Sequence, residues 1–321
     1  MEIDTRFPTK LDAVFDAPEP LRTALVESIP SGEPVRLLVH APAFLKGDEK
    51  LPATVLAVTN NGWLVASETA EGGAALEKSA FSDILFLELT SILLLGQLRI
   101  SFGAVDTSYF VTIKFETVGE EFYREAIDLM LAGIGPVRTA VAEKDRNEAS
   151  MFEAWPMKFR NEAQRYWPSG QRLLAAIQWP AVFGGFQRQL APAGALLITE
   201  RELVLISEEK FSAEPPPDTP SAEEPTDRPP EQETPPTPTE TPSETPLVPV
   251  GFGGIITFVP RVRLADFHVS HQERFGVLAL QVHAARGGEK LEIIFPSDEE
   301  KAVSKTMEQV LLSRGSATQT I

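Results

Sequence analysis

Residues 57–65 read Ala-Val-Thr-Asn-Asn-Gly-Trp-Leu-Val, two apolar runs that flank a polar turn. Asn61-Gly62 is a strong signal for a tight hairpin between two strands, because both residue types tolerate the backbone conformation that such a turn needs. Residues 197–205, Leu-Ile-Thr-Glu-Arg-Glu-Leu-Val-Leu, repeat the order of apolar run, threonine, polar turn and second apolar run. We therefore expect the same hairpin twice in one chain.

The sequence around the two hairpins also corresponds, which indicates an internal repeat. Upstream the shift between equivalent residues is 138, around the hairpins it is 140, and towards the C-terminus it is 180. Prolines and glycines restrict or free the backbone, so matches of this kind are informative even when few. The matched pairs include Pro18 and Pro156, Arg22 and Arg160, Pro30 and Pro168, Gly32 and Gly170, Thr59 and Thr199, Ser67 and Ser207, Gly96 and Gly276, Leu98 and Leu278, and Phe115 and Phe295.

The hydrophobic pattern predicts the same elements in each copy: a short helix that ends at Pro-Ser-Gly, six or seven strands, and a closing amphipathic helix. Met130 lies on the apolar face of the first closing helix, and Met307 lies on the apolar face of the second. We expect an α+β fold in which each copy is a curled antiparallel sheet of six to seven strands closed by its C-terminal helix. The expected strands are 35–40, 54–59, 63–67, 84–89, 97–102 and 110–115, then 173–178, 194–199, 202–207, 262–269, 277–283 and 291–295.

One segment differs sharply from the rest of the chain. Residues 212–250 include 13 prolines, nine acidic residues and one base, Arg228, and contain no aromatic residue. Such a segment buries too little apolar surface to offset the entropy of ordering, so we expect it to be disordered. Its length is close to the jump in the repeat shift, which places it as an insertion in the second copy.

These features predict the domain organisation. We expect an N-terminal lead-in (1–17), a first domain (18–134), a helical connector (135–155), a second domain (156–314) that carries the disordered insert 212–250, and a disordered tail (315–321).

This order of elements resembles the pleckstrin-homology-like superfold, in particular its GRAM-like and bacterial PH-like branches. The resemblance is carried by residues 57–65 and 197–205, by Phe81-Ser82-Asp83-Ile84 and Val259-Pro260-Arg261-Val262, and by the Gly-x-Leu strand and closing helix that follow. It implies two PH-like domains in tandem and a binding or scaffolding role. Because domains of this superfold bind lipids, peptides or assembly partners, the resemblance does not specify which.

The overall charge narrows the set of partners. The 321 residues include 46 acids and 29 bases, which gives a net charge of −17. A chain with this net charge repels phosphate groups. We therefore expect it not to bind nucleic acid through its overall charge, and we expect binding to membrane lipid to be unfavourable. Cysteine is absent, which excludes disulfides, thiolate metal sites and a cysteine nucleophile. No stretch has the roughly 20 apolar residues of a membrane helix, so we expect a soluble, cytoplasmic protein.

Candidate chemistry is sparse. A phosphoinositide site would need several converging bases, yet Lys46-Gly47-Asp48-Glu49-Lys50 has no net charge and Gly184-Gly185-Phe186-Gln187-Arg188 has one base. His268, His271 and His283 lie near Glu273, but residues three apart on a strand point to opposite faces, so we predict no metal site. His40 has no counterpart in the second copy and is expected to be structural.

No catalytic motif is present either. The sequence contains no Gly-x-Ser-x-Gly elbow and no His-Glu-x-x-His helix. Gly251-Phe252-Gly253-Gly254 lacks the lysine of a phosphate loop and is expected to return the chain to the sheet. Glu120–Glu121 is expected to begin a helix, where acids suit the dipole. We therefore expect no catalytic, cofactor-binding or metal-binding residue.

Two further segments allow either a docking or a structural role. Met151, Phe152, Trp155 and Phe159 form an apolar stripe in the connector, which we expect to pack against its own domains. Pro235–Pro238 could dock into an aromatic groove of a partner, but a flexible acidic loop is the simpler interpretation. The sequence favours a non-enzymatic protein or peptide interaction module over a peripheral lipid-binding protein or an enzyme of unrecognised type. The partner and the oligomeric state stay open.

Overall fold

The computed structural model describes residues 6–104, 107–135, 150–168, 171–184, 189–208, 253–272 and 275–315, except the side chains of 309 and 311–315. These residues form one compact unit. The expected disordered insert (212–250) and nearly all of the expected tail lie outside the described residues.

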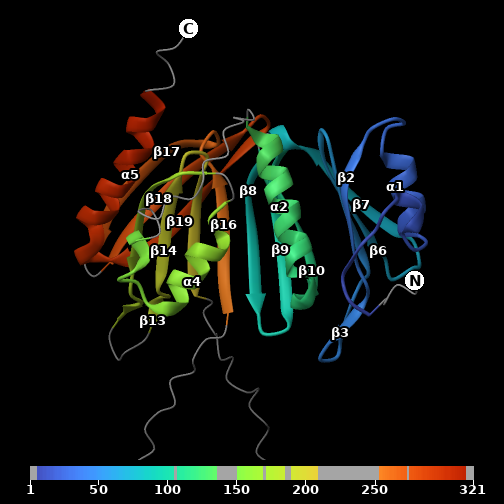
Figure 1. Cartoon of the computed structure of the whole chain (residues 1–321), viewed down its shortest axis with the longest axis horizontal. Coiled ribbons are helices and arrows are strands. Elements are labelled where there is room, and N and C mark those ends of the chain that lie inside the picture. The colour runs from blue at the N-terminus through green and yellow to red at the C-terminus, as the bar shows by residue number, and fades with distance from the viewer. Residues whose placement is uncertain are drawn as a thin grey trace, which may run out of the picture. The chain divides into compact units, whose positions relative to one another are not determined.

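The first copy contains a helix, a run of antiparallel strands and a closing helix, as the sequence predicts (Figure 1). A short strand β1 (Thr9–Lys10) precedes it. Its elements are α1 (Leu21–Ser28), β2 (Val35–Ala41), β3 (Phe44–Lys46), β4 (Glu49–Leu51), β5 (Thr54–Thr59), β6 (Gly62–Glu68), β7 (Ala74–Ala80), β8 (Ile84–Ile92), β9 (Leu95–Ala104), β10 (Thr107–Glu116) and α2 (Glu120–Ile134).

The second copy repeats this order. Its elements are α4 (Met157–Tyr166), β11 (Leu173–Trp179), β12 (Val182–Phe183), β13 (Gln189–Ala191), β14 (Gly194–Thr199), β15 (Glu202–Glu208), β16 (Gly253–Pro260), β17 (Leu264–Gln272), β18 (Phe275–Ala284), β19 (Gly287–Pro296) and α5 (Glu300–Gly315). The insert separates β15 from β16, whereas in the first copy a short loop joins the equivalent strands β6 and β7.

The hairpin that decides the fold has the same local structure in both copies. The Thr59 hydroxyl accepts hydrogen bonds from the backbone N–H groups of Asn61 (3.2 Å) and Gly62 (3.1 Å). The Thr199 hydroxyl accepts from the backbone N–H of Glu202 at 2.9 Å. The threonine in each hairpin therefore satisfies turn donors that the strand ladder leaves unpaired.

Irregularities of the ladder recur as well. β8 shifts register against β9 between Ile84 and Phe86, and β17 shifts against β18 at the equivalent step after Leu264. A Cβ atom on Gly96 would overlap the ring of Phe115, and one on Gly276 would overlap the ring of Phe295. The matched glycines and phenylalanines of the sequence repeat are thus contact pairs, in which only glycine leaves room for the ring.

The sequence analysis expected one curled sheet in each copy, and this expectation is wrong: the strands of each copy are divided between two main sheets. In the first copy β1-β2-β5-β6-β7 form one sheet, while β8, β9 and β10 belong to another. The second copy divides in the same way, with β17-β18-β19 as a separate three-stranded sheet. The break falls after β7 and after β16, where a short turn redirects the chain before the next strand.

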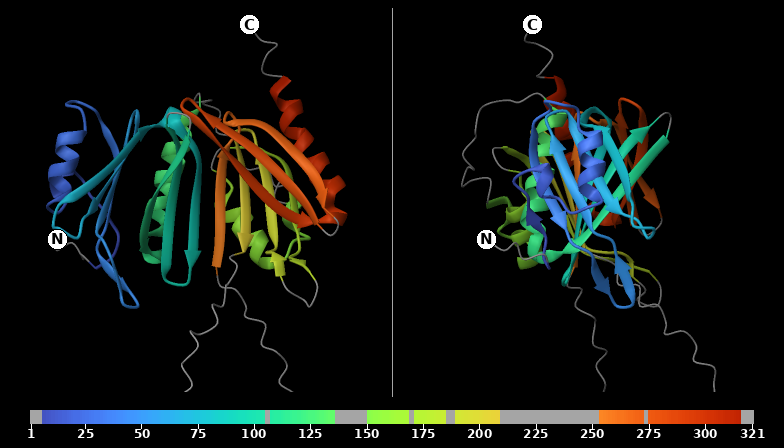
Figure 2. Two further views of the ribbon diagram at one scale, coloured as in Figure 1. Left: turned by 180° about the vertical axis from the view of Figure 1, so that it is seen from behind. Right: turned by 90° about the vertical axis from the view of Figure 1, so that its right-hand side faces the viewer.

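The two copies share one sheet. β8 of the first copy pairs antiparallel with β16 of the second, from Leu87 opposite Phe258 to Ile92 opposite Gly253. The result is a seven-stranded sheet in the order β10-β9-β8-β16-β15-β14-β11 (Figure 1). Seen from behind, β17–β19 and α5 lie over the part of this sheet that the second copy supplies (Figure 2). The expected boundary between the two domains is therefore crossed by a continuous ladder.

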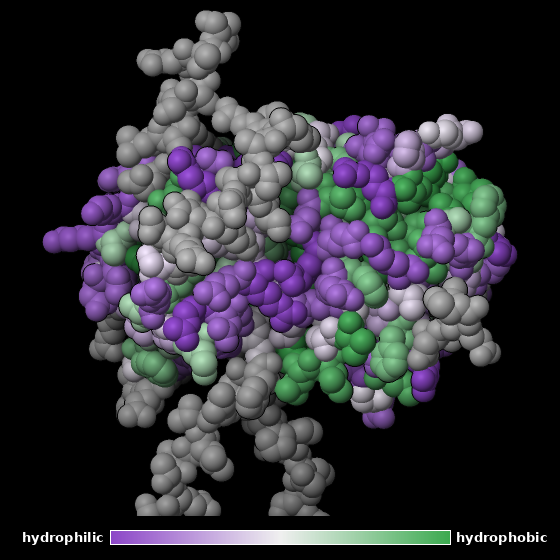
Figure 3. Space-filling view, in the orientation of Figure 1, coloured by the Kyte–Doolittle hydropathy of each residue, from purple (hydrophilic) through white to green (hydrophobic). Residues whose placement is uncertain are grey.

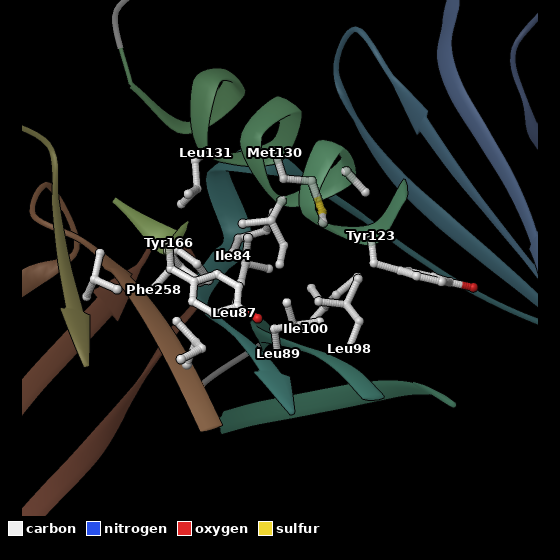
Figure 4. Close-up of a cluster of buried hydrophobic side chains, with 14 of the residues drawn as sticks. Ile84, Leu87, Leu89, Leu98, Ile100, Tyr123, Met130, Leu131, Tyr166 and Phe258 are labelled. Atoms are coloured by element: carbon white, nitrogen blue, oxygen red, sulfur yellow. The ribbon is translucent and has the colours of Figure 1, made fainter. Parts of the chain in front are cut away.

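The apolar core also crosses that boundary. One cluster joins Leu87 and Leu89 of β8 and Met130 of α2 to Tyr166 of α4 and Phe258 of β16 (Figure 4). A second cluster lies inside the second copy, and a third lies under α1. Met130 and Met307 are both fully buried, which confirms the predicted inward faces of the two closing helices.

Several short strands were not expected from the sequence. β7, with the sequence Ala-Ala-Leu-Glu-Lys-Ser-Ala, combines small and charged residues with one leucine and is mostly exposed, so it has no strong apolar signal. β16 follows the Gly-rich run that was interpreted only as a return to the sheet, and Gly253 and Gly254 are already strand residues. The sequence analysis also missed the small hairpins β3–β4 and β12–β13. Each of their strands has only two or three residues, which is too few to show a periodic pattern.

Candidate functional site

A buried carboxylate lies at the seam between the two copies, by which we mean the β8–β16 pairing and the helices α2 and α4 that pack beside it. Glu120, the first residue of α2, accepts hydrogen bonds from the Ser91 hydroxyl (2.8 Å) and the Tyr166 hydroxyl (2.7 Å), and pairs with Arg165 at 2.8 Å. Ser91 belongs to β8, and Tyr166 and Arg165 belong to α4. Burial, the charge of Glu120 and the hydrogen bond to it raise the pKa of Tyr166. This cluster is well satisfied and serves to join the copies.

A second polar contact marks the base of the insert. Lys158 of α4 donates to the backbone oxygen of Gly253 (2.9 Å) and pairs with Glu208 at 3.3 Å. Glu208 and Gly253 are the last and first described residues on either side of the insert. Figure 3 shows hydrophilic side chains running across α4 and α2. The chain on both sides of the insert is therefore tied to α4.

A different surface lies at the turn between β8 and β9. Leu93 and Leu94 form this turn and are 69% and 76% exposed. Val118, in the link from β10 to α2, is 66% exposed. The neighbouring Thr117 holds them together, since its backbone N–H donates to the Leu94 carbonyl (3.0 Å) and its hydroxyl donates to the Leu93 carbonyl (3.1 Å). We call Leu93, Leu94 and Val118 the apolar tip.

The backbone at this turn suits other residues better than leucine. Leu93 has a φ of 52°, and among the described residues it is the only non-glycine with a positive φ. That conformation favours Gly, Asn or Asp and is costly for a bulky side chain. An exposed leucine held there brings no core packing in return. Packing within the described part of the fold therefore does not explain the leucine at this position.

The second copy provides an internal control for the apolar tip. By the shift of 180 that relates β8 to β17, the residues equivalent to Leu93, Leu94 and Val118 are Glu273, Arg274 and Asp298. β17 ends at Gln272 and β18 begins at Phe275, so the second hairpin also has a two-residue connection. At three equivalent positions the second copy has charged residues and the first has apolar ones. The scaffold itself thus does not require apolar residues there.

The apolar tip lies in an apolar area of the surface. Figure 3 shows apolar side chains gathered over the turn of β8–β9 and the start of α2, below the hydrophilic band. Pro8 packs against Gly119, which directly precedes α2, and the neighbouring Phe7 is partly exposed. Contiguous exposed apolar patches of a few hundred Å² on soluble domains are commonly functional.

The loops weighed for lipid binding do not gather bases. Lys46 and Lys50 lie on the exposed hairpin β3–β4, where Lys46 is opposite Glu49 and Lys50 is opposite Leu45. Lys114 of β10 reaches this hairpin but pairs with Glu49 at 3.5 Å. In the second copy only Gly184 of residues 184–188 is described. The described part of this region offers no cluster of converging cations.

The histidines are dispersed over the second copy. His268 and His271 lie on β17 and His283 lies on β18, while Glu273 is outside the described residues. His271 Nδ1 lies 3.1 Å from Glu300 Oε2 at the start of α5. Within the described ranges no group of three or more histidines and carboxylates could hold a metal ion. His40 is buried, and burial lowers its pKa.

The remaining candidates have structural positions. Phe152 and Phe159 of the connector stripe are buried in the shared core with Trp155 beside them, whereas Met151 is exposed. Glu121 is exposed at the start of α2. Gly251, Phe252 and the segment Pro235–Pro238 lie outside the described residues.

The sequence analysis missed the apolar tip. The strand pattern around residues 84–95 does not distinguish the buried part of this stretch from its exposed end. A position-by-position comparison of the two copies would have found it, because the exchange of Leu-Leu for Glu-Arg is visible in the sequence.

No protein-family model and no curated protein matches this sequence. The comparison of the two copies with each other is therefore the main guide to function. None of the helices in the described part of the chain is both long enough and apolar enough to span a membrane.

Proposed function

We propose that this chain is a non-enzymatic protein-interaction module built from two PH-like domains (18–134 and 156–314), and that the apolar tip is its contact surface. Support for the tandem arrangement comes from the repeated order of strands and closing helix, the repeated register shift in β8 and β17, and the repeated glycine–phenylalanine pairs. The two copies are fused through the β8–β16 ladder. Such a rigid body suits a scaffold that presents a surface in a fixed orientation.

One observation carries the proposal: the first copy holds apolar side chains at three exposed positions where the second copy has charges. Burying one leucine or valine side chain in a partner releases about 1.5–3 kcal/mol. A few such residues seated in a pocket supply most of the energy of many protein interfaces. The net charge of −17 would speed encounter with a partner that is basic around its pocket.

The test exchanges the tip for the residues of the second copy. The variant Leu93→Glu, Leu94→Arg, Val118→Asp should fold like the parent, because the second copy has those residues at the equivalent positions of its sequence. Affinity purification from the native host with quantitative mass spectrometry should recover a protein with the parent and lose it with the variant. Val262→Asp is the matched control, since Val262 is 62% exposed but lies elsewhere, between β16 and β17.

Two outcomes would overturn the proposal. One is a set of captured proteins that is unchanged by the triple variant. The other is co-sedimentation with phosphatidylcholine or phosphatidylserine vesicles that the triple variant abolishes, which would make the tip a membrane-inserting element and the protein a peripheral lipid binder.

A further inference from the structure

The β14–β15 turn of the second copy contains a buried carboxylate. Glu202 is 1% exposed and lies at the position that Gly62 occupies in the first copy. A Cβ on Gly62 would overlap the backbone oxygen of Ser79 in β7, so the first copy has no room for a side chain there. The second copy has room for a glutamate and fills it with an ionisable group.

Glu202 is surrounded mostly by neutral hydrogen-bonding groups. Gln171 and Thr199 hydrogen-bond to its carboxyl group, and the Thr199 hydroxyl also donates to Gln171 Oε1 at 2.6 Å. Arg261 donates from Nη1 to the backbone oxygens of Thr199 and Glu200, and from Nη2 to the Val310 oxygen of α5. Arg261 thus fixes the turn from the α5 side.

The charged groups near Glu202 come from the turn and from α2. Arg201 Nε lies 3.9 Å from Glu202 Oε1. Glu200, the other acid of the turn, is directed to Arg172 at 3.5 Å. Asp128 of α2 adds a negative charge that acts on Glu202. Arg201 and Asp128 therefore act on this carboxylate with opposite charges, Arg201 from the second copy and Asp128 from the first.

Arg201 connects this turn to the first copy. Its Nη2 donates to the backbone oxygen of Leu131 at 3.1 Å, in the last turn of α2. A helix C-terminus exposes carbonyl oxygens that have no partner within the helix, and an arginine is well suited to satisfy them. Arg201 is therefore shared between the end of α2 and the carboxylate of Glu202.

We propose that Glu202 is a proton-controlled latch between the second copy and the C-terminal end of α2. With Glu202 neutral, Arg201 keeps its bond to Leu131 and α2 stays docked. When Glu202 loses its proton to solvent, the buried carboxylate draws Arg201 towards itself, and the bond to Leu131 weakens. The first copy has glycine at this position and carries no counterpart of the latch.

The environment of Glu202 sets the pH range. Burial, above all, raises the pKa of Glu202 to about 7, against the smaller opposing effects of Arg201, Gln171 and Thr199. A carboxyl group whose pKa is raised by folding favours the folded state at low pH. That contribution is complete below the ordinary pKa of the residue and is lost as pH rises to about 7.

The experiment compares Glu202→Gln with the parent between pH 5.5 and 8.5. Glutamine has the shape of the neutral acid, so this variant should fold and keep the latch closed at every pH. In the parent, the melting temperature should fall as pH rises to about 7 and level off above it. Amide exchange at Leu131–Gly135 should speed up several-fold beyond its ordinary pH dependence as Glu202 loses its proton. In Glu202→Gln both trends should be much weaker than in the parent.

Glu200→Gln is the matched control, because Glu200 lies in the same turn, is half exposed and faces Arg172. It should follow the parent. The latch is refuted if Glu202→Gln retains the pH dependence of the parent, or if the carboxyl carbon of Glu202, followed by NMR, titrates near pH 4. A third contradictory result would be a pH-dependent melting temperature with no change in exchange at the end of α2, which would leave Glu202 as a local stability element only.

Discussion

The two copies of the repeat share one framework and differ at its exposed and ionisable positions. Both have the threonine-centred hairpin, the glycine–phenylalanine pair and the closing helix. At the β8–β9 turn, however, the first copy carries Leu93 and Leu94 where the second carries Glu273 and Arg274. A residue type that the fold requires would be present in both copies. The shared threonine, glycine and phenylalanine positions are therefore assigned to the fold, whereas the leucines at the β8–β9 turn are not required by it.

The seam itself shows the same contrast. Glu120 and Glu300 are equivalent first residues of the closing helices. Glu120 is buried against Ser91, Tyr166 and Arg165, whereas Glu300 is partly exposed and meets His271. Both glutamates begin a helix, but only Glu120 also links the two copies. The surrounding tertiary structure, not the residue type, decides its role.

The largest effect is expected from charges placed in the two cores. Met130→Asp and Met307→Asp should each lower the free energy of unfolding by about 3–5 kcal/mol, because each buries an unpaired carboxylate. Urea unfolding followed by fluorescence measures this loss. Met157→Asp is the control, since Met157 is 67% exposed, and it should change stability by less than about 0.5 kcal/mol.

The same experiment tests whether the copies are independent. The shared sheet and core predict one cooperative transition in each variant. Two separate transitions, with only the mutated copy destabilised, would show that the seam contributes little.

The next largest change in the free energy of unfolding is expected when the two equivalent glutamates, Glu120 and Glu300, are each replaced by alanine. Glu120→Ala should cost about 2–3 kcal/mol, because it leaves the Tyr166 hydroxyl without its acceptor inside the protein and removes the partner of Arg165. Glu300→Ala should cost less than about 0.5 kcal/mol, since its contact with His271 is at the surface. Chemical denaturation of both variants measures the difference. Equal losses would contradict the assignment of Glu120 as the link across the seam.

A smaller and matched pair of effects is expected at the equivalent glycines. Gly96→Ala and Gly276→Ala should each destabilise the protein by about 1–3 kcal/mol, because the new methyl group would overlap Phe115 or Phe295. Gly73→Ala is the control, because its new methyl group would lie 3.4 Å from its nearest neighbour, the Thr69 hydroxyl oxygen. Calorimetric melting is sufficient here, and a loss confined to one copy would show that the two repeats do not pack alike.

The smallest expected effect is an increase in the free energy of unfolding, at Leu93. Leu93→Asn should raise the free energy of unfolding by a few tenths to about 1 kcal/mol, because asparagine tolerates the positive φ of this position better than leucine. The same variant should weaken capture of any partner that depends on the apolar tip. Leu94→Asn is the comparison, since Leu94 does not have a positive φ, and it should bring no gain. A loss of stability in Leu93→Asn would mean that this leucine packs within the fold.

Much of the fold could be predicted because the relevant signals are local. Asn61-Gly62 marked one hairpin, and its equivalence to the turn before Glu202 marked the other. The seam could not be predicted, because β8 and β16 are far apart in the sequence and their apolar patterns do not specify a neighbour. The apolar tip was missed since an apolar pattern predicts burial, whereas Leu93 and Leu94 lie at an exposed turn.

The sequence by itself determined the repeat, the order of the longer apolar strands and the closing helices, and the inward faces of Met130 and Met307, because turn residues and hydrophobic periods act over short distances. Only the tertiary structure decided that β16 would extend the sheet of the first copy, that Glu120 would be buried and that Glu202 would lie beside the end of α2. A strand pattern fixes which face is apolar but leaves both edges open to any partner strand. The choice of partner depends on how the whole of each copy packs against the other, and the burial of individual polar groups follows from that packing.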